Sequence, residues 1–284
     1  MNSRRLVWVG LTCLFTITQC KNDNQLVTEG GTVINYVKKG TGDLPTHGET
    51  VSLNMEYRDE DDRIIYDTKS VGDPVQIFFD TAGWRRAGPL YHVMANLRVG
   101  DSVYFNMSAE DLYHKTFAQR LPDTIRAGSD LTFRIGFVSS LTKEDMDRIA
   151  RAQQFKVDEE IIDQYLESNN IDAQSTGSGL HYVIHDQGEG PQPQYGDEVV
   201  VHYIGELLDG TQFDSSYERK EPFVFTCGYG HVVAGWDEGI ELLGKGGKAT
   251  LYVPSPLAYG EAGLGGNIGP NSILKFDVEL VDIR

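Results

Sequence analysis

Cysteine and positive charge are both scarce in this chain. Its 284 residues include only three cysteines, Cys13, Cys20 and Cys227, which is too few for a disulfide framework. Packed cores must therefore stabilise the fold. Lys and Arg number 25 against 42 for Asp and Glu, which gives a formal net charge of −17. Because so acidic a chain repels phosphate backbones, we expect no nucleic-acid partner.

The sequence contains one short uncharged, apolar segment near its start. Leu6–Ile17 carries no charge and follows the basic residues Arg4 and Arg5. A membrane-spanning helix needs roughly 20 apolar residues, and this run is shorter. The pattern is typical of a secretory signal peptide, which we assign to residues 1–19.

Cys20 follows this segment directly and begins a polar stretch. The arrangement resembles a bacterial lipoprotein signal, in which the new N-terminal cysteine is acylated and tethers the protein to a membrane. Gln19 departs from that pattern, because the position before the cysteine usually holds a small residue. The alternative is an ordinary secreted protein with an incidental cysteine. We assign residues 20–29 to an N-terminal tether.

Two long segments of the remaining chain share one pattern. Gly48 begins a Gly-acidic-X-Val sequence that matches the one at Gly196, and Phe133 lies in a strand-like sequence that matches the one around Phe276. Self-similarity at a fixed spacing indicates a duplicated unit. We therefore predict one domain at residues 30–140 and a second at residues 178–284.

Residues 141–177 are predicted to form a helical connector between the two domains. Thr142 and Asp145 resemble a capping box at the start of one helix. Asp158 is predicted to cap a second helix, with Val157 and Ile162 packed across its first turn. The stretch Gln174–Gly179 is rich in small polar residues and is predicted to be a flexible linker.

The second domain is predicted to be an antiparallel sheet wrapped around one short helix. Hydrophobic residues fill both faces of Val199–Ile204 and alternate in Leu274–Leu280, and Asp209-Gly210 is a strong hairpin turn. Trp236–Leu243 has helical spacing and ends at Gly244. Strands with one covering helix predict an α+β fold.

Six segments of this domain contain motifs at fixed spacings: Val201–Gly205, Asp209–Ser216, Pro222–Phe225, Val232–Trp236, Ala258–Gly260 and Phe276–Leu280. In these motifs the domain resembles the FKBP-type peptidyl-prolyl cis/trans isomerase family. The spacings agree over about 105 residues without a large gap, which makes the resemblance specific.

The resemblance implies a proline-binding pocket. Trp236 would be its floor, Tyr259 would offer a hydroxyl to a substrate carbonyl, and Asp214 would lie beside the reacting imide. Taken singly, large aromatic residues are more often core residues, but their joint spacing favours a pocket. The implied catalytic residues are Asp214, Tyr259 and Phe213, and the implied binding residues are Tyr203, Arg219, Phe223, Val232, Val233, Trp236, Ile268 and Phe276.

Two positions at the pocket edge depart from the family pattern. His231 and Leu264 stand where the best-studied single-domain members carry Glu and His, so substrate preference should differ more than the chemistry. His181 and His185 lie four residues apart on one predicted strand. Because no Cys or carboxylate is spaced nearby to complete a zinc site, we expect no metal. Cys227 is predicted to be a small core residue.

The first domain is predicted to be a degenerate copy without isomerase activity. Tyr66-Asp67 aligns with Phe213-Asp214, and Tyr113 aligns with Tyr259. The pocket floor and walls are missing, because the positions of Tyr203, Trp236, Val232 and Val233 correspond to Met55, Leu90, Arg86 and Ala87.

These observations predict a membrane-anchored, extracytoplasmic peptidyl-prolyl isomerase that assists the folding of exported proteins. Its partners would be proline-containing unfolded chains, and macrolide ligands of the family should compete for the pocket. Rotation about the imide requires no covalent step, so we expect no cofactor. The alternative is a chaperone or assembly factor that holds clients without essential turnover.

Overall fold

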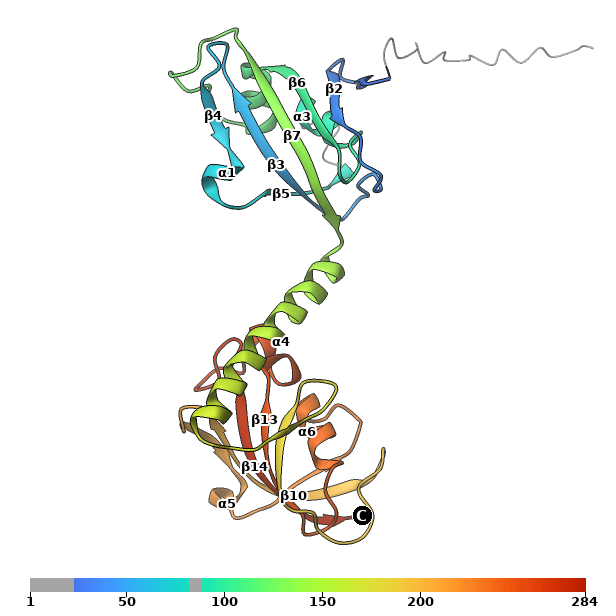
Figure 1. The fold of residues 1–284 in the computed structure, drawn as a ribbon, viewed down its shortest axis with the longest axis vertical. Coiled ribbons are helices and arrows are strands. Elements are labelled where there is room, and N and C mark those ends of the chain that lie inside the picture. Colours follow the sequence, from blue (N-terminus) through green and yellow to red (C-terminus); the bar gives the residue numbers. More distant parts are fainter. Residues whose placement is uncertain (1–22, 82–87) are drawn as a thin grey trace, which may run out of the picture. The chain divides into compact units, whose positions relative to one another are not determined.

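The computed structural model describes residues 23–81 and 88–284, which form two compact units that divide between Met146 and Asp147 (Figure 1). The predicted signal peptide, Cys20, Arg86 and Ala87 lie outside the described residues. Each unit contains an antiparallel sheet with short helices, and the two are linked in sequence by one long helix.

The first unit is built on a seven-stranded sheet with the strand order β1-β2-β6-β7-β3-β4, in which β5 also pairs with β3. Its described residues also form two short helices and one π-helical turn. The strands are β1 (Gln25–Val27), β2 (Val33–Lys38), β3 (Thr50–Arg58), β4 (Ile64–Asp67), β5 (Val75–Phe78), β6 (Ser102–Ser108) and β7 (Asp130–Leu141). The helices are α1 (Thr68–Val71) and α3 (Pro89–Met94), and the π-helical turn is η1 (Asp111–Thr116).

The second unit repeats this strand order: β8-β9-β13-β14-β10-β11, with β12 paired to β10. The predicted α+β fold, with two similar sheets around short helices, is confirmed. The strands are β8 (Gln174–Ser175), β9 (His181–Asp186), β10 (Glu198–Leu207), β11 (Gln212–Ser215), β12 (Phe223–Thr226), β13 (Lys248–Val253) and β14 (Leu274–Ile283). The helices are α5 (Ser216–Arg219), α6 (Ala234–Ile240) and the 3-10 turns η2 (Ser255–Leu257) and η3 (Gly260–Ala262).

The predicted hairpin turn and covering helix are both present in the second unit. Leu207 and Thr211 close the turn between β10 and β11, and Gly210 there has a φ of 85°. Helix α6 packs against β13 so closely that a Cβ at Gly239 would lie 2.5 Å from the Leu251 side chain. The helix ends at Ile240, earlier than predicted, and Leu243 is buried in the following turn.

The connector is one continuous helix, α4 (Lys143–Ser168), and the prediction of two helices was wrong. Its start is the predicted capping box, in which the Thr142 hydroxyl accepts from the Asp145 N–H at 3.1 Å and donates to its carboxylate at 2.8 Å. Asp158 lies inside the helix and is buried, whereas Val157 is half exposed. No described helix is both long and apolar enough to cross a bilayer.

The C-terminal part of α4 belongs to the second unit. Ile162 and Leu166 pack against Tyr252 and Ile273 in a small core of their own. The segment Gln174–Gly179 is not the flexible linker that we predicted, because β8 pairs with β9 and a hydrogen-bonded turn follows it. The helix is thereby attached to the sheet at its C-terminal end.

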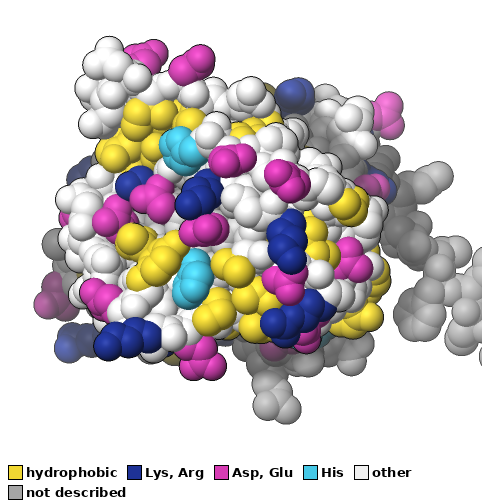
Figure 2. Space-filling model, turned by 90° about the horizontal axis from the view of Figure 1, so that it is seen from below, with side chains coloured by type: hydrophobic (Ala, Val, Ile, Leu, Met, Phe, Trp, Pro, Cys, Tyr) yellow, Lys and Arg dark blue, Asp and Glu magenta, His cyan; other side chains and the backbone are white. Residues whose placement is uncertain are grey.

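Each unit has its own hydrophobic core on one face of its sheet. The core of the second unit includes the free thiol of Cys227, which is fully buried. Not all large hydrophobic side chains are inside: Tyr195, Phe223 and Val224 are among the exposed ones. Figure 2 shows such side chains as patches between acidic and basic groups on one face of the molecule.

Candidate functional site

The core of the second unit opens to the surface through a cavity of about 240 Å³. Strands β10, β11, β12 and β14 and helix α6 contribute its walls, so residues far apart in sequence meet there. The lining residues are Tyr203, Phe213, Asp214, Phe223, His231, Val232, Val233, Trp236, Tyr259 and Phe276. This set contains every predicted site residue except Arg219 and Ile268, and it adds His231.

Trp236 lies at the centre of this aromatic group. Its ring is 4% exposed and meets the rings of Tyr203 and Phe276 edge to face, at centroid distances of 4.8 and 5.2 Å. Helix α6 holds the indole there because Gly235 lets the helix approach Val253; a Cβ at Gly235 would lie 2.5 Å from that side chain. The buried indole N–H has no hydrogen-bond partner among the described residues.

One side of the cavity is polar. Asp214 accepts hydrogen bonds from the Tyr203 hydroxyl and from the Arg219 guanidinium, and Arg219 also donates to the Tyr203 oxygen at 2.9 Å. Burial and the hydrogen bond to Asp214 raise the pKa of Tyr203. The hydrogen bond to Tyr203 raises the pKa of Arg219. Tyr203 and Arg219 are therefore protonated at neutral pH. Arg219 is not among the residues that line the cavity.

Ser216 fixes this polar side, and our sequence reasoning missed it. Its hydroxyl accepts from the Tyr203 N–H at 2.8 Å and donates to the Tyr203 carbonyl at 3.2 Å, and it lies 2.9 Å from His202 Nδ1. The side chain is fully buried at the start of α5. Its place directly after Asp214-Ser215 was visible in the sequence, but only the fold brings it to the Tyr203 backbone.

Tyr259 joins the cavity to a neighbouring hollow of about 450 Å³. This second hollow is lined by Phe213, Asp214 and the loop Leu264–Ile268. Ile268 is buried there, in a tight turn closed by its own backbone bonds to Gly265, so it shapes the rim rather than the aromatic cavity. Burial and the charge of Asp214 raise the pKa of Tyr259, which keeps its hydroxyl protonated.

A buried carboxylate on α4 holds the segment that leads to Tyr259. Asp158 Oδ2 accepts from the N–H and the hydroxyl of Ser255 at 2.7 and 2.6 Å, and Oδ1 accepts from Gln154 at 2.6 Å. Asp158 is 1% exposed and Ser255 is fully buried. We call this group the α4 clamp. It replaces the helix-capping role that we predicted for Asp158.

Comparison with known proteins identifies the family. Residues 190–281 match the family described as FKBP-type peptidyl-prolyl cis-trans isomerase. The chain is similar to the peptidyl-prolyl cis-trans isomerase FPR2 of Saccharomyces cerevisiae, with 53% identity over 90 residues that cover 31% of this chain and 67% of that protein. The chain belongs to the FKBP-type peptidyl-prolyl cis-trans isomerase family.

Other FKBP-type relatives are matched over differing shares of their length. The probable FKBP-type isomerase FkpA of Neisseria meningitidis is 53% identical over 109 residues, which cover 38% of this chain and 39% of that protein. The crystal structure of FkpA from Escherichia coli matches with 37% identity and a TM-score of 0.41, over 52% of this chain and 75% of that one. The chain spans about half or less of the length of the curated FkpA proteins that it matches.

The first unit has the FKBP-like strand order but a different set of side chains at the cavity positions. The Met55 N–H bonds to the Thr68 hydroxyl at 3.1 Å, as the Tyr203 N–H bonds to Ser216, so Met55 occupies the position of Tyr203 as predicted. This equivalence corrects the predicted alignment of Tyr66-Asp67 by one residue. In the strand ladders, Asp67 pairs with Glu56, and Ser215 pairs with Ile204. Asp67 therefore corresponds to Ser215. Tyr66, rather than Asp67, corresponds to Asp214.

Tyr57 fills the space that remains open in the second unit. It corresponds to Gly205, and its ring stacks on Phe133 at 4.9 Å and on Tyr66 at 5.6 Å. Burial and a hydrogen bond with Tyr113 raise its pKa. Leu90 and Tyr113, at the predicted positions of Trp236 and Tyr259, are also buried in this core.

The two histidines that we considered as metal ligands bind different partners. His181 Nε2 lies 3.5 Å from Asp163, and His185 Nε2 lies 2.8 Å from the Thr250 hydroxyl. Within residues 23–81 and 88–284, no group of three or more His, Cys, Asp or Glu side chains is arranged to hold a metal ion.

Proposed function

We propose that the second unit catalyses cis/trans isomerisation of X–Pro peptide bonds in exported proteins. The observation that carries this proposal is the aromatic cavity with Trp236 at its centre and Asp214 and Tyr259 at its edge. Its volume of about 240 Å³ suits one proline residue rather than a large cofactor. The membership of the family supports the same activity.

The reaction needs a lower rotation barrier and no bond cleavage. Amide resonance gives the imide bond a barrier of ~18–20 kcal/mol, and cis and trans X–Pro forms differ by only about 0.5–1 kcal/mol. An apolar cavity disfavours the polar planar form of the amide relative to the twisted one. Tighter binding of the twisted imide than of the planar imide accelerates rotation, with each tenfold in rate requiring about 1.4 kcal/mol.

The residues at the polar edge of the cavity have separate roles in this reaction. The proline ring packs against Trp236, and the protonated Tyr259 hydroxyl donates to a substrate carbonyl. Asp214 is held by Tyr203 and Arg219, so its charge lies at a fixed place beside the twisted imide. A carboxylate that is already oriented requires no reorganisation during rotation.

A matched pair of variants tests the site. Phe276→Leu removes a cavity wall in the second unit, and Phe133→Leu changes the corresponding buried strand position in the first unit. Each substitution should lower the stability of its own unit. Isomerisation of a short X–Pro peptide should fall at least tenfold in Phe276→Leu and stay unchanged in Phe133→Leu. A folded Phe276→Leu protein with the wild-type rate would contradict the assigned site.

The location is also part of the proposal. The apolar segment before Cys20 favours export, and an acylated Cys20 would tether the chain to a bacterial membrane outside the cytoplasm. Partners there are proline-containing chains that have not completed folding. Macrolide ligands of the family should compete with peptide for the cavity of the second unit.

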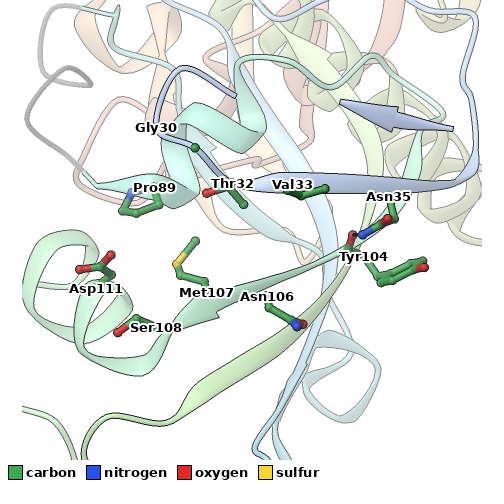
Figure 3. Close-up of a pocket in the computed structure, with 11 residues that line it drawn as sticks. Gly30, Thr32, Val33, Asn35, Pro89, Tyr104, Asn106, Met107, Ser108 and Asp111 are labelled. Atoms are coloured by element: carbon green, nitrogen blue, oxygen red, sulfur yellow. Dashed lines mark hydrogen bonds between the residues drawn. The ribbon is translucent and has the colours of Figure 1, made fainter. Parts of the chain in front are cut away.

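A second candidate function, client binding without turnover, is favoured by an opening in the first unit. Strands β2 and β6 pair at Asn35 and Tyr104 and then diverge, leaving a pocket of about 430 Å³ between Val33 and Met107 (Figure 3). Residues 105–108 of β6 have no pairing partner on this side within the described chain. An extended client segment would add to that free edge.

Two substitutions on β2 separate this function from catalysis. Val33 lines the opening and Val37 does not, although both are exposed on the same strand. Val33→Glu should weaken suppression of client aggregation, whereas Val37→Glu should not. Both variants should isomerise a short peptide at the wild-type rate. Equal suppression of client aggregation by Val33→Glu and wild type would contradict a client-binding role for this opening.

A further inference from the structure

A groove of about 690 Å³ lies between α4 and the segment that follows β13. Ala150, Arg151 and Val157 are on its helical wall, and Pro256, Ala258 and Glu261 are on the opposite wall. All of these residues belong to the second unit. The volume lies within the ~300–1,000 Å³ that is typical of ligand-binding clefts.

The groove and the aromatic cavity share one lining residue. Tyr259 lines the groove, the cavity around Trp236 and the hollow near Leu264. A chain whose proline lies on Trp236 therefore passes Tyr259 on its way out. Because Tyr259 borders both spaces and each residue of an extended chain spans ~3.3–3.6 Å, a few residues beyond the proline are long enough to enter the groove.

The walls of the groove are held in place before any ligand arrives. The α4 clamp joins Asp158 to Ser255, and Ser255 directly precedes Pro256 on the far wall. One turn further along α4, Ile162 packs in the core with Tyr252. A preformed groove costs less ordering entropy on binding than one that must close around its ligand.

The walls of the groove offer both apolar and charged contacts to a polypeptide segment. Val157 is 50% exposed, and Ala150, Pro256 and Ala258 provide further apolar surface. Arg151 and Glu261 place opposite charges on opposite walls, and neither forms an ion pair within residues 23–81 and 88–284.

Exposed amide groups of Gln153 and Asn271 can exchange hydrogen bonds with a peptide backbone. A bound segment therefore meets both apolar contacts for its side chains and polar contacts for its backbone.

We infer that this groove binds the part of the substrate polypeptide that flanks the isomerised proline. The inference rests on the proposed isomerase function, because the occupant is the same chain that fills the aromatic cavity. Its consequence is a preference for long substrates: a peptide that reaches only the cavity should be bound and turned over less well than one that continues into the groove. The gain should come from one flank only, because the groove lies on one side of Tyr259.

The experiment uses the full mature chain and three peptides with the same uncharged X–Pro core. One is a tetrapeptide, one is extended by about six residues at its N-terminus, and one by the same number at its C-terminus. Exchange NMR gives the isomerisation rate, and fluorescence anisotropy gives the affinity. Ala150→Trp fills the groove, and Ala152→Trp places the same side chain at an exposed position of α4 outside the groove lining.

For the wild type we expect one extended peptide to exceed the tetrapeptide in affinity and kcat/KM by at least about fourfold, the factor that corresponds to one buried methylene group. Ala150→Trp should abolish this advantage and leave the tetrapeptide rate unchanged, and Ala152→Trp should behave as wild type. An advantage that persists in Ala150→Trp, or an equal loss on all three peptides, would overturn the inference.

Failure of the proposed function has a different signature. A wild type that binds the extended peptide more tightly but accelerates none of the three would refute isomerisation while supporting the groove. Equal affinities of wild type for all three peptides, with normal turnover, would refute the groove alone.

Discussion

Replacing the buried carboxylate of the α4 clamp should destabilise the second unit in a graded way. Asp158→Ala leaves the N–H and the hydroxyl of Ser255 buried without a partner, and removes the bond from Gln154. Each unsatisfied buried group costs about 1–3 kcal/mol. Two such groups are left by this substitution, so we expect the free energy of unfolding to fall by about 2–6 kcal/mol.

Asp158→Asn should cost much less, because its shape is almost the same. The amide oxygen replaces Oδ2 as acceptor for both Ser255 donors, and Gln154 can rotate its amide to accept from the new NH₂ group. Only the charge assistance of the three hydrogen bonds is lost, which corresponds to about 1–2 kcal/mol. Ser255→Ala removes one donor and keeps the backbone bond, so its cost should be similar to that of Asp158→Asn.

Urea unfolding measures these values if one tryptophan reports on the second unit. The sequence has Trp8, Trp84 and Trp236, and Trp8 lies in the predicted signal peptide. In a Trp84→Phe background, the fluorescence of the mature chain comes from Trp236. Linear extrapolation gives the free energy for each variant, provided that the denaturant slope is unchanged. Costs below about 1 kcal/mol for both Asp158 variants would refute the reasoning, because a buried hydrogen-bonded carboxylate cannot be lost so cheaply.

Three further outcomes are expected. Because burial raises the pKa of Tyr203 and Tyr259, the isomerisation rate should be constant between pH 8 and 9 and change only above the ordinary tyrosine pKa of about 10; a loss of rate between pH 8 and 9 would contradict this. Burial raises the pKa of the Cys227 thiol to about 11, so a thiol reagent at pH 8 should react only after unfolding. The free energy of unfolding should decrease as pH rises from about 9 to 11, because only the unfolded thiol ionises in that range. Rapid labelling of the native protein would contradict this. Cys20→Ala should release the protein from membranes or block its processing, and fully soluble, unmodified wild-type protein would reject lipidation.

The repeated strand order and most of the cavity could be predicted from the sequence because both depend on spacing. Turn glycines, alternating strand residues and aromatic positions recur at fixed intervals, and the strands that contain them pair in register. Residue type was a poorer guide than spacing in the first unit. We matched Tyr66-Asp67 to Phe213-Asp214 by similarity, whereas Met55 and Thr68 are separated by the same 13 residues as Tyr203 and Ser216.

The role of Asp158 could not be predicted from local sequence. Aspartate before a helical stripe is typical of an N-cap, and we interpreted it in that way. Its partner Ser255 is 97 residues away, and only the packing of α4 on the second unit brings the two together. The continuity of α4 has the same cause, because helix ends predicted from propensity are overridden by tertiary contacts.

The presence of two copies of one strand order in a single chain has a consequence for folding. During synthesis or refolding, β3 and β10 compete for equivalent places, and tandem repeats are prone to such exchange. The Tyr57 and Gly205 pair opposes it: even a Cβ at Gly205 would lie 2.6 Å from the Phe213 ring, so β3 cannot replace β10 without displacing that ring. The difference between Tyr57 and Gly205 thus also protects the second sheet from the entry of β3.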